Sequence, residues 1–119
     1  MINEAEFLAA LITCETFSEF CAHKLTDLEI DSKVAKAWLD SSRCPRHPFD
    51  RYAQATHLHM IKRSMKIRTS WVTSGNNTLA DTCSREFFSM KPSGHLINGV
   101  ILRKVRPKWQ NVMKFIPII

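Results

Sequence analysis

Residues 31–48, DSKVAKAWLDSSRCPRHP, combine a short helical pattern with a break rich in proline and arginine. Asp31 can cap the helix, and Pro45 and Pro48 end the pattern because residues before proline avoid helical backbone. Apolar residues recur at helical spacing on one side of the segment: Val34, Ala35, Trp38 and Leu39. The stretch therefore predicts a helix over 32–41 with one buried side and one outward, basic side.

Two further helices are expected before this segment, over 3–12 and 16–25. Asn3 can cap the first, and Thr16 with Glu19 has the spacing of a capping box for the second. The intervening TDLEID is polar apart from two apolar residues and predicts a connection without regular structure. Three helices within about forty residues are typical of the helix-turn-helix layout.

The sequence after the proline break predicts one more helix and then strands. The helix is expected over 49–65, with Tyr52 on its buried side. From 65 to 88, apolar and polar residues alternate on both sides of the turn sequence 74–77, which favours two strands. A further strand candidate, HLINGVILRKV at 95–105, contains Asn-Gly as a turn or bulge.

These patterns together predict an α+β fold. A helical, helix-turn-helix-like half at 1–65 is expected to bind DNA. A small antiparallel β unit at 66–119 is expected to follow it and to mediate self-association. The length of 119 residues is that of one compact domain, and we expect both parts to share it.

Charge is distributed unevenly along the chain. The net charge is +6, but residues 1–32 carry −6 and residues 33–119 carry +12. Such an asymmetry indicates a polyanionic partner, with a solvated basic surface as the alternative. The sequence has neither an apolar run of membrane-spanning length nor the basic start of a signal peptide, so we expect a cytoplasmic protein without membrane contact.

The helix over 32–41 is the expected DNA reader, since recognition helices meet base edges with residues near their N-terminal end. Outward-pointing side chains there can bond to bases or phosphates: Ser32, Lys33 and Lys36. Arginines just past the helix can hold flanking phosphates: Arg43, Arg46 and Arg51. The basic run 61–68 predicts either a second phosphate-binding patch or a solvated face, through Lys62, Arg63 and Lys66.

The segment SKVAKAWLDSSRCPRHPFDRY resembles a part of small phage and prophage helix-turn-helix regulators. In those proteins a Trp-Leu pair precedes a proline-bearing loop and another helix. In some, a tryptophan then opens a small β unit with a leucine and a later phenylalanine, to which Trp71, Leu79 and Phe87 are similar. The likeness covers residues 16–90. It implies a sequence-specific DNA-binding transcriptional regulator of phage or mobile-element type.

Metal binding and catalysis are not expected. Four zinc-capable side chains lie within sixteen residues, at Cys44, His47, His57 and His59. The last two are two positions apart, however, and would diverge on a helix, so we expect no metal site. The sequence contains no phosphate-binding loop, dinucleotide motif or paired catalytic carboxylates, and we expect neither an enzyme nor a cofactor.

Three further readings concern partners. A small phage-type protein can instead bind and inhibit a host protein or a nucleic-acid-handling complex, which is the alternative to double-stranded DNA. An RNA-binding protein would need exposed aromatic residues on a sheet. We also expect a homodimer, because 95–105 and the tail at 115–119 offer apolar surface, and because two symmetric copies strengthen DNA binding.

Overall fold

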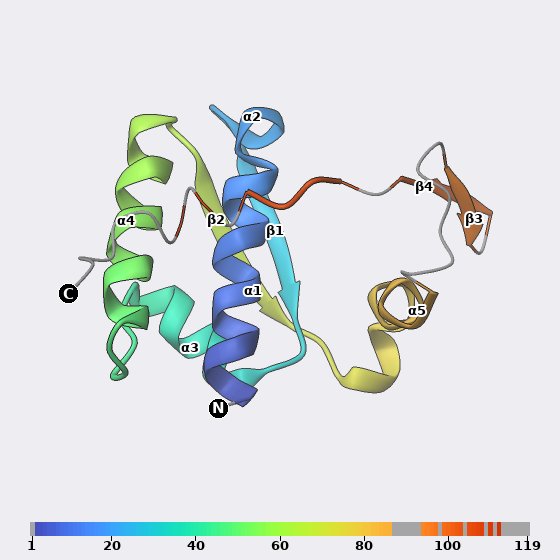
Figure 1. The fold of residues 1–119 in the computed structure, drawn as a ribbon, viewed down its shortest axis with the longest axis horizontal. Coiled ribbons are helices and arrows are strands. Elements are labelled where there is room, and N and C mark those ends of the chain that lie inside the picture. The colour runs from blue at the N-terminus through green and yellow to red at the C-terminus, as the bar shows by residue number, and fades with distance from the viewer. Residues whose placement is uncertain are drawn as a thin grey trace. The chain divides into compact units, whose positions relative to one another are not determined.

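The structure is a computed structural model that describes residues 2–86, 94–97, 99–103, 105–108, 110 and 112. The chain divides into two compact units (Figure 1). The first comprises Met1–Trp71 together with Pro107–Ile119, and the second comprises Val72–Arg106. Because the boundary lies after Trp71, the strand that follows residue 65 belongs to the first unit.

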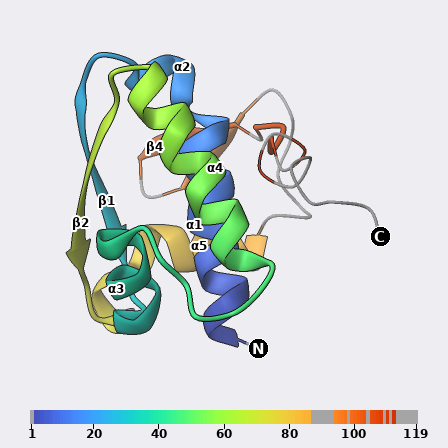
Figure 2. The same cartoon turned by 90° about the vertical axis from the view of Figure 1, so that its left-hand side faces the viewer.

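The first unit is a layer of helices on a two-stranded sheet. Its elements, in chain order, are α1 (Ile2–Thr16), α2 (Ser18–Cys21), β1 (Leu25–Ile30), α3 (Lys33–Ser41), α4 (Phe49–Lys62) and β2 (Lys66–Trp71). The three longer helices lie on the same face of the sheet (Figure 2). On the opposite face Arg68 reaches Asp27 across the strands at 3.6 Å, and Ser70 donates a hydrogen bond to Asp27 at 2.9 Å.

The strands of this sheet are parallel, so the expected fold class is wrong in its antiparallel pairing. β1 pairs with β2 in a register that runs from Leu25 opposite Lys66 to Ile30 opposite Trp71. Parallel neighbours need a long crossover connection, which is usually helical. Here α3 and α4 supply that crossover. The fold is α+β with a helical N-terminal part, but its first strand lies inside that part.

The predicted helix-turn-helix layout is also wrong, because a strand separates α2 from α3. The helix expected over 16–25 shrinks to the four residues of α2, and α1 continues to Thr16 instead of ending near residue 12. Thr16 does not cap a helix, since its Oγ1 donates to the Ile12 carbonyl at 2.7 Å. Phe20 of α2 is 72% exposed.

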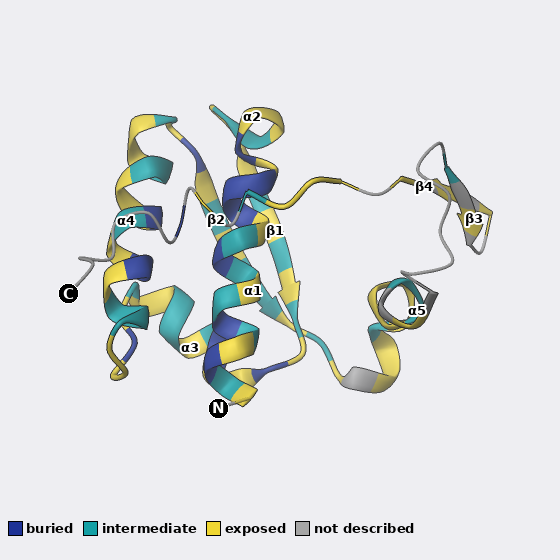
Figure 3. Ribbon diagram, viewed as in Figure 1, coloured by how far each residue is buried: buried dark blue, intermediate teal, exposed yellow. Residues whose placement is uncertain are grey.

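The core of the first unit lies between α1, α3 and α4 (Figure 3). Its buried residues are Phe7, Leu11, Ala35, Cys44, Tyr52, Ala53 and Val112. Trp38 packs on this cluster edge-to-face with Phe7, with ring centroids 5.6 Å apart. Such pairs add attraction beyond the buried area because the positive ring edge meets the negative face. Tyr52 is buried, as the helical pattern predicts.

Residues that follow the second unit complete the first one. The Lys108 amide donates to Thr16 Oγ1 at 3.0 Å, and its ammonium lies 3.3 Å from the Glu19 carboxylate. Val112 is fully buried within the core cluster. The core of the first unit is therefore built from two stretches that are far apart in the sequence.

The second unit contains η1 (Ser74–Asn76), α5 (Thr78–Glu86), β3 (His95–Ile97) and β4 (Val100–Leu102). The expected strand after the turn at 74–77 is wrong, since that stretch forms α5, with Arg85 bridging Asp81 at 3.1 Å on one side of the helix. β3 and β4 are antiparallel, and Gly99 between them has a φ of +79°, which favours glycine. Phe87 and the tail at 115–119 lie outside the described residues, so the expected self-association stays a prediction.

Candidate nucleic-acid interface

The outward side of α4 carries an exposed stripe of mostly polar side chains. Tyr52, Ala53 and Thr56 are buried on the inner side of the helix. On the opposite side, the positions one helical turn apart carry both long polar and apolar side chains. This row begins at Arg51 and ends at Lys62. The amphipathic sequence of α4 therefore presents both of these cations to solvent on one helix.

This stripe borders a shallow pocket of about 630 Å³. Its walls are Asp50, Arg51, Gln54, Ala55, Leu58, His59 and Lys62. Arg51 and Lys62 are eleven positions apart, so they stand about 16 Å apart along the helix axis at 1.5 Å per residue. Both are exposed, and among the described residues neither has an ion-pair partner. The acid of the pocket, Asp50, is already engaged by His47 at 3.2 Å.

A buried carboxylate of α1 holds the C-terminal half of α4 in place. Glu15 is 1% exposed, and His59 Nδ1 lies 2.5 Å from its Oε1. Arg63 lies 3.6 Å from the other oxygen of the same carboxylate. A charge removed from water is stable only when it has polar or charged partners, and Glu15 has the His59 ring nitrogen and the Arg63 guanidinium beside it. This cluster sets the position of α4 on α1.

Each of the three residues expected to read bases from α3 has a contact within the first unit. Ser32 is buried and caps the helix by accepting a hydrogen bond from the Ala35 amide at 3.1 Å, so its expected outward direction is wrong. Lys33 is exposed and its ammonium lies 4.4 Å from the centre of the Trp71 ring, a cation–π contact with β2. Lys36 bridges Asp40 at 2.8 Å.

Asp40 ties this side of α3 to the sheet. Besides the bond from Lys36, its carboxylate accepts a hydrogen bond from the Thr69 hydroxyl of β2. The two donors, Lys36 first, lower the pKa of Asp40 below its usual value. Polar residues of α3 thus contact β2 while part of their surface stays exposed to solvent.

The expected phosphate contacts divide into paired and unpaired residues. Arg46 lies 3.2 Å from the largely buried Glu4, and Arg63 belongs to the Glu15 cluster. Arg43, Arg51, Lys62 and Lys66 are exposed and have no ion pair within the described part of the chain. Sequence reasoning placed Arg51 and Lys62 in separate patches, whereas the structure puts both at one pocket. The sequence signal that could have grouped the two residues is their spacing of eleven positions, which puts them on the same side of one helix.

Folding also removes most of the charge asymmetry. The first unit, residues 1–71 and 107–119, contains twelve Lys or Arg and nine Asp or Glu, which gives a net charge of +3. The acidic N-terminal segment lies against basic residues from later in the chain, as in the pairs Arg46–Glu4 and Arg68–Asp27. The basic character of residues 33–119 is therefore not a measure of the surface charge of the first unit.

The four zinc-capable side chains have separate surroundings. His57 Nδ1 lies 3.3 Å from the Ser42 hydroxyl, His59 contacts Glu15 and His47 contacts Asp50. Within the described ranges, no three His, Cys, Asp or Glu residues form a group that can hold a metal ion. The structure therefore does not assemble Cys44 and the three histidines into one site.

Comparisons of the chain with family models, curated proteins and solved structures found no match. In the part of the chain that the structure describes, no helix combines the length and the apolar character that a membrane span requires. The function must therefore be argued from the geometry of the first unit.

Proposed function

We propose that the protein binds double-stranded DNA through its phosphate backbone, with the α4 pocket as the contact surface. The observation that carries this proposal is the pair of exposed cations, Arg51 and Lys62, at one pocket that holds a single carboxylate, Asp50, which lies 3.2 Å from His47 Nδ1. Unpaired cations release counterions when they meet phosphates, which is the main driving force of backbone binding. Gln54 adds an uncharged donor between them.

A role as a transcriptional regulator is a further step, because the helix-turn-helix layout behind the resemblance to phage and prophage regulators is absent from the first unit. Phosphate contacts position a protein on DNA but carry no sequence information directly. A transcriptional regulator of phage or mobile-element type would need base contacts in addition. Among the residues expected to contact DNA, Arg43 lies just past α3, is exposed and has no ion pair within the described residues.

The salt dependence of binding tests the proposal. We expect the double variant Arg51→Gln/Lys62→Gln to bind a random DNA duplex more weakly than the parent. The slope of log affinity against log salt should fall by about two, because each lost phosphate contact removes close to one unit. Fluorescence anisotropy of a labelled duplex, titrated at several salt concentrations, measures both quantities.

A matched control is the double variant Lys33→Gln/Arg68→Gln, which also removes two positive charges from the first unit but not from the pocket. It should keep the parent's salt slope, although its affinity falls slightly with the lower net charge. Equal slopes for the pocket variant and the parent, at unchanged melting temperatures, would exclude the α4 pocket as the DNA-binding surface.

A further inference from the structure

Two turns of the first unit are joined at the end where α1 and α4 finish and where β1 and β2 begin (Figure 1, Figure 2). The His23 amide donates a hydrogen bond to the Arg63 carbonyl at 3.1 Å. The Lys66 amide donates to the Lys24 carbonyl at 3.0 Å. His23 and Ser64 have φ values of 62° and 51°, which are uncommon for residues other than glycine. The two hydrogen bonds hold these tight turns side by side.

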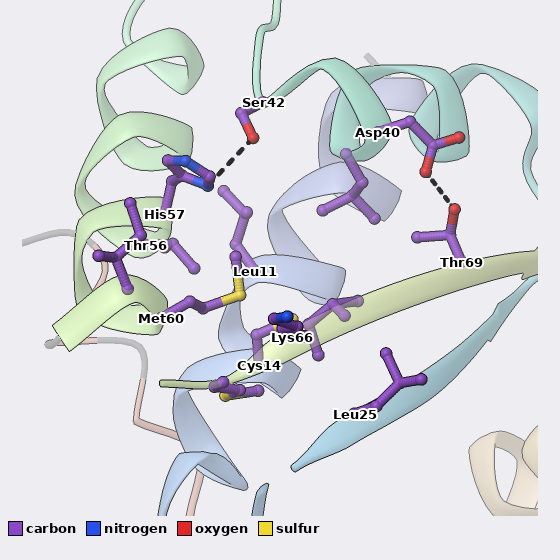
Figure 4. Close-up of a pocket in the computed structure, with 14 residues that line it drawn as sticks. Leu11, Cys14, Leu25, Asp40, Ser42, Thr56, His57, Met60, Lys66 and Thr69 are labelled. Atoms are coloured by element: carbon purple, nitrogen blue, oxygen red, sulfur yellow. Dashed lines mark hydrogen bonds between the residues drawn. The ribbon is translucent and has the colours of Figure 1, made fainter. Parts of the chain in front are cut away.

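Three large apolar side chains are exposed at this end of the unit. Phe20 of α2 is 72% exposed, Leu25 at the start of β1 is 65% exposed, and Ile61 in the last turn of α4 is 60% exposed. Leu25 and Ile61 also line a pocket of about 520 Å³ on the inner side of α4, where Leu25 lies opposite Lys66 in the register of the sheet (Figure 4). Single exposed apolar residues are common, but three from different elements at one end mark an interaction surface.

The charge of this end is positive when its ion pairs are taken into account. The acids of residues 15–27 and the single acid of the pocket each have a basic partner: Glu15–Arg63, Glu19–Lys108, Asp27–Arg68 and Asp40–Lys36. Three exposed lysines have no ion pair in the described part of the chain: Lys24, Lys62 and Lys66. The surface therefore combines exposed apolar side chains with cations that are not offset by a neighbouring acid of their own.

We propose that this end of the first unit binds the surface of an anionic lipid bilayer. A bilayer complements both features, because its anionic head groups attract the lysines and the boundary of its acyl chains accepts the apolar side chains. Nucleic acid would offer phosphates but no hydrocarbon for Phe20, Leu25 and Ile61. The proposal departs from the sequence-based expectation of no membrane contact, which considered only membrane-spanning runs and signal peptides. Side chains that enter the head-group boundary need no spanning helix.

Co-sedimentation of the full chain with lipid vesicles measures the binding. We expect the protein to bind vesicles of mixed phosphatidylcholine and phosphatidylserine, and to bind vesicles of phosphatidylcholine alone much more weakly. Lys24→Gln should weaken binding to the anionic vesicles about fivefold, the effect of one basic residue at such a surface. Its matched control is Lys33→Gln, which removes an exposed lysine beside Trp71 at the other end of β2 and should have a much smaller effect.

Leu25→Ser tests the apolar part of the surface and should weaken binding to the anionic vesicles about tenfold. Phe20→Ser, at the most exposed of the three apolar residues, should have a similar effect. The matched control is Ile2→Ser, because Ile2 is 71% exposed but begins α1, at the far end of that helix from the joined turns. All three variants should melt close to the parent, since the replaced side chains are largely exposed.

Three results would overturn the proposal. The first is a parent protein that does not bind the anionic vesicles, or that binds neutral vesicles equally well. The second is a Lys24→Gln variant that binds as tightly as Lys33→Gln. The third is an equal loss of binding for Leu25→Ser and Ile2→Ser. Lys62 is kept in every variant because it also borders the α4 pocket. The assay contains only protein and lipid, so its outcome does not depend on whether the protein binds DNA.

Discussion

The side chain of Asp40 holds the helix α3 against the strand β2. Its carboxylate joins α3 to β2 by accepting hydrogen bonds from Lys36 and Thr69, and these donors lower its pKa. Because the pKa of the folded state is lowered, the charged form contributes stability above the ordinary value near 3.8. That contribution is lost as the pH falls through the lowered value of the folded state.

We therefore predict that Asp40→Asn is less stable than the parent at neutral pH and that the difference shrinks as the pH drops below about 4. Urea unfolding at a series of pH values measures the free energy of unfolding of both proteins. The control is Asp31→Asn, an exposed residue with no ion pair or side-chain hydrogen bond in the described part of the chain. A difference between Asp40→Asn and the parent that is independent of pH would contradict the assignment.

At the scale of elements, the contact between α3 and α1 depends on Trp38. Its ring meets Phe7 edge-to-face over the core cluster. We predict that Trp38→Ala lowers the free energy of unfolding by about 3 kcal/mol, as for other large aromatic residues packed on a core. Val34→Ala, on the exposed side of the same helix, should change it by less than about 0.5 kcal/mol. Chemical denaturation compares the two, and similar small losses would mean that α3 is not anchored through Trp38.

The helices around the proline break could be predicted from the sequence. The helix expected over 32–41 is present as α3, with Ser32 rather than Asp31 as its cap, and the one expected over 49–65 is present as α4. Local signals suffice here because helical spacing and prolines act over a few residues. On the inner side of α4 the pattern predicted Tyr52, whereas Thr56, which is buried on the same side, is polar and was not predicted.

The sheet could not be predicted in the same way. β1 alternates exposed and half-buried residues, but its apolar residues are few and its partner lies some forty residues later. Nothing local to Leu25–Ile30 indicates that pairing. Thr16 and Glu19 had the spacing of a capping box, yet the hydroxyl of Thr16 bonds back into α1. The pockets on the two sides of α4 were missed for the related reason that they join residues from several elements.

At the scale of the whole molecule, charges far apart in the sequence neutralise one another. The acidic N-terminal segment provides partners for Arg46, Arg63 and Lys108. The net charge of +6 is therefore weaker evidence for a polyanionic partner than it is before these ion pairs are taken into account. What remains for a ligand is the smaller set of cations that folding leaves unpaired.

We predict that Glu15→Gln lowers the free energy of unfolding by about 3 kcal/mol, because it removes the buried carboxylate that faces the Arg63 guanidinium and the His59 ring nitrogen. The matched control is Glu19→Gln, which also loses an ion pair with a basic residue but is highly exposed, and should cost at most about 1 kcal/mol. Thermal and urea unfolding of both variants decide between the two outcomes. Equal losses would show that burial does not determine the strength of these pairs.

The core of the first unit is built from residues that precede and residues that follow the second unit in the sequence, and this has a consequence for biosynthesis. Phe7 leaves the ribosome early, whereas Val112, which packs in the same cluster, is made only after the whole second unit. Synthesis proceeds at about 5–20 residues per second. For several seconds, therefore, the core-facing apolar residues of α1, α3 and α4 lack the packing partner that Val112 provides. During this time chaperones can bind the exposed apolar surface of the nascent chain. Translation arrest before Val112 would yield an aggregation-prone, protease-sensitive product rather than a functional fragment.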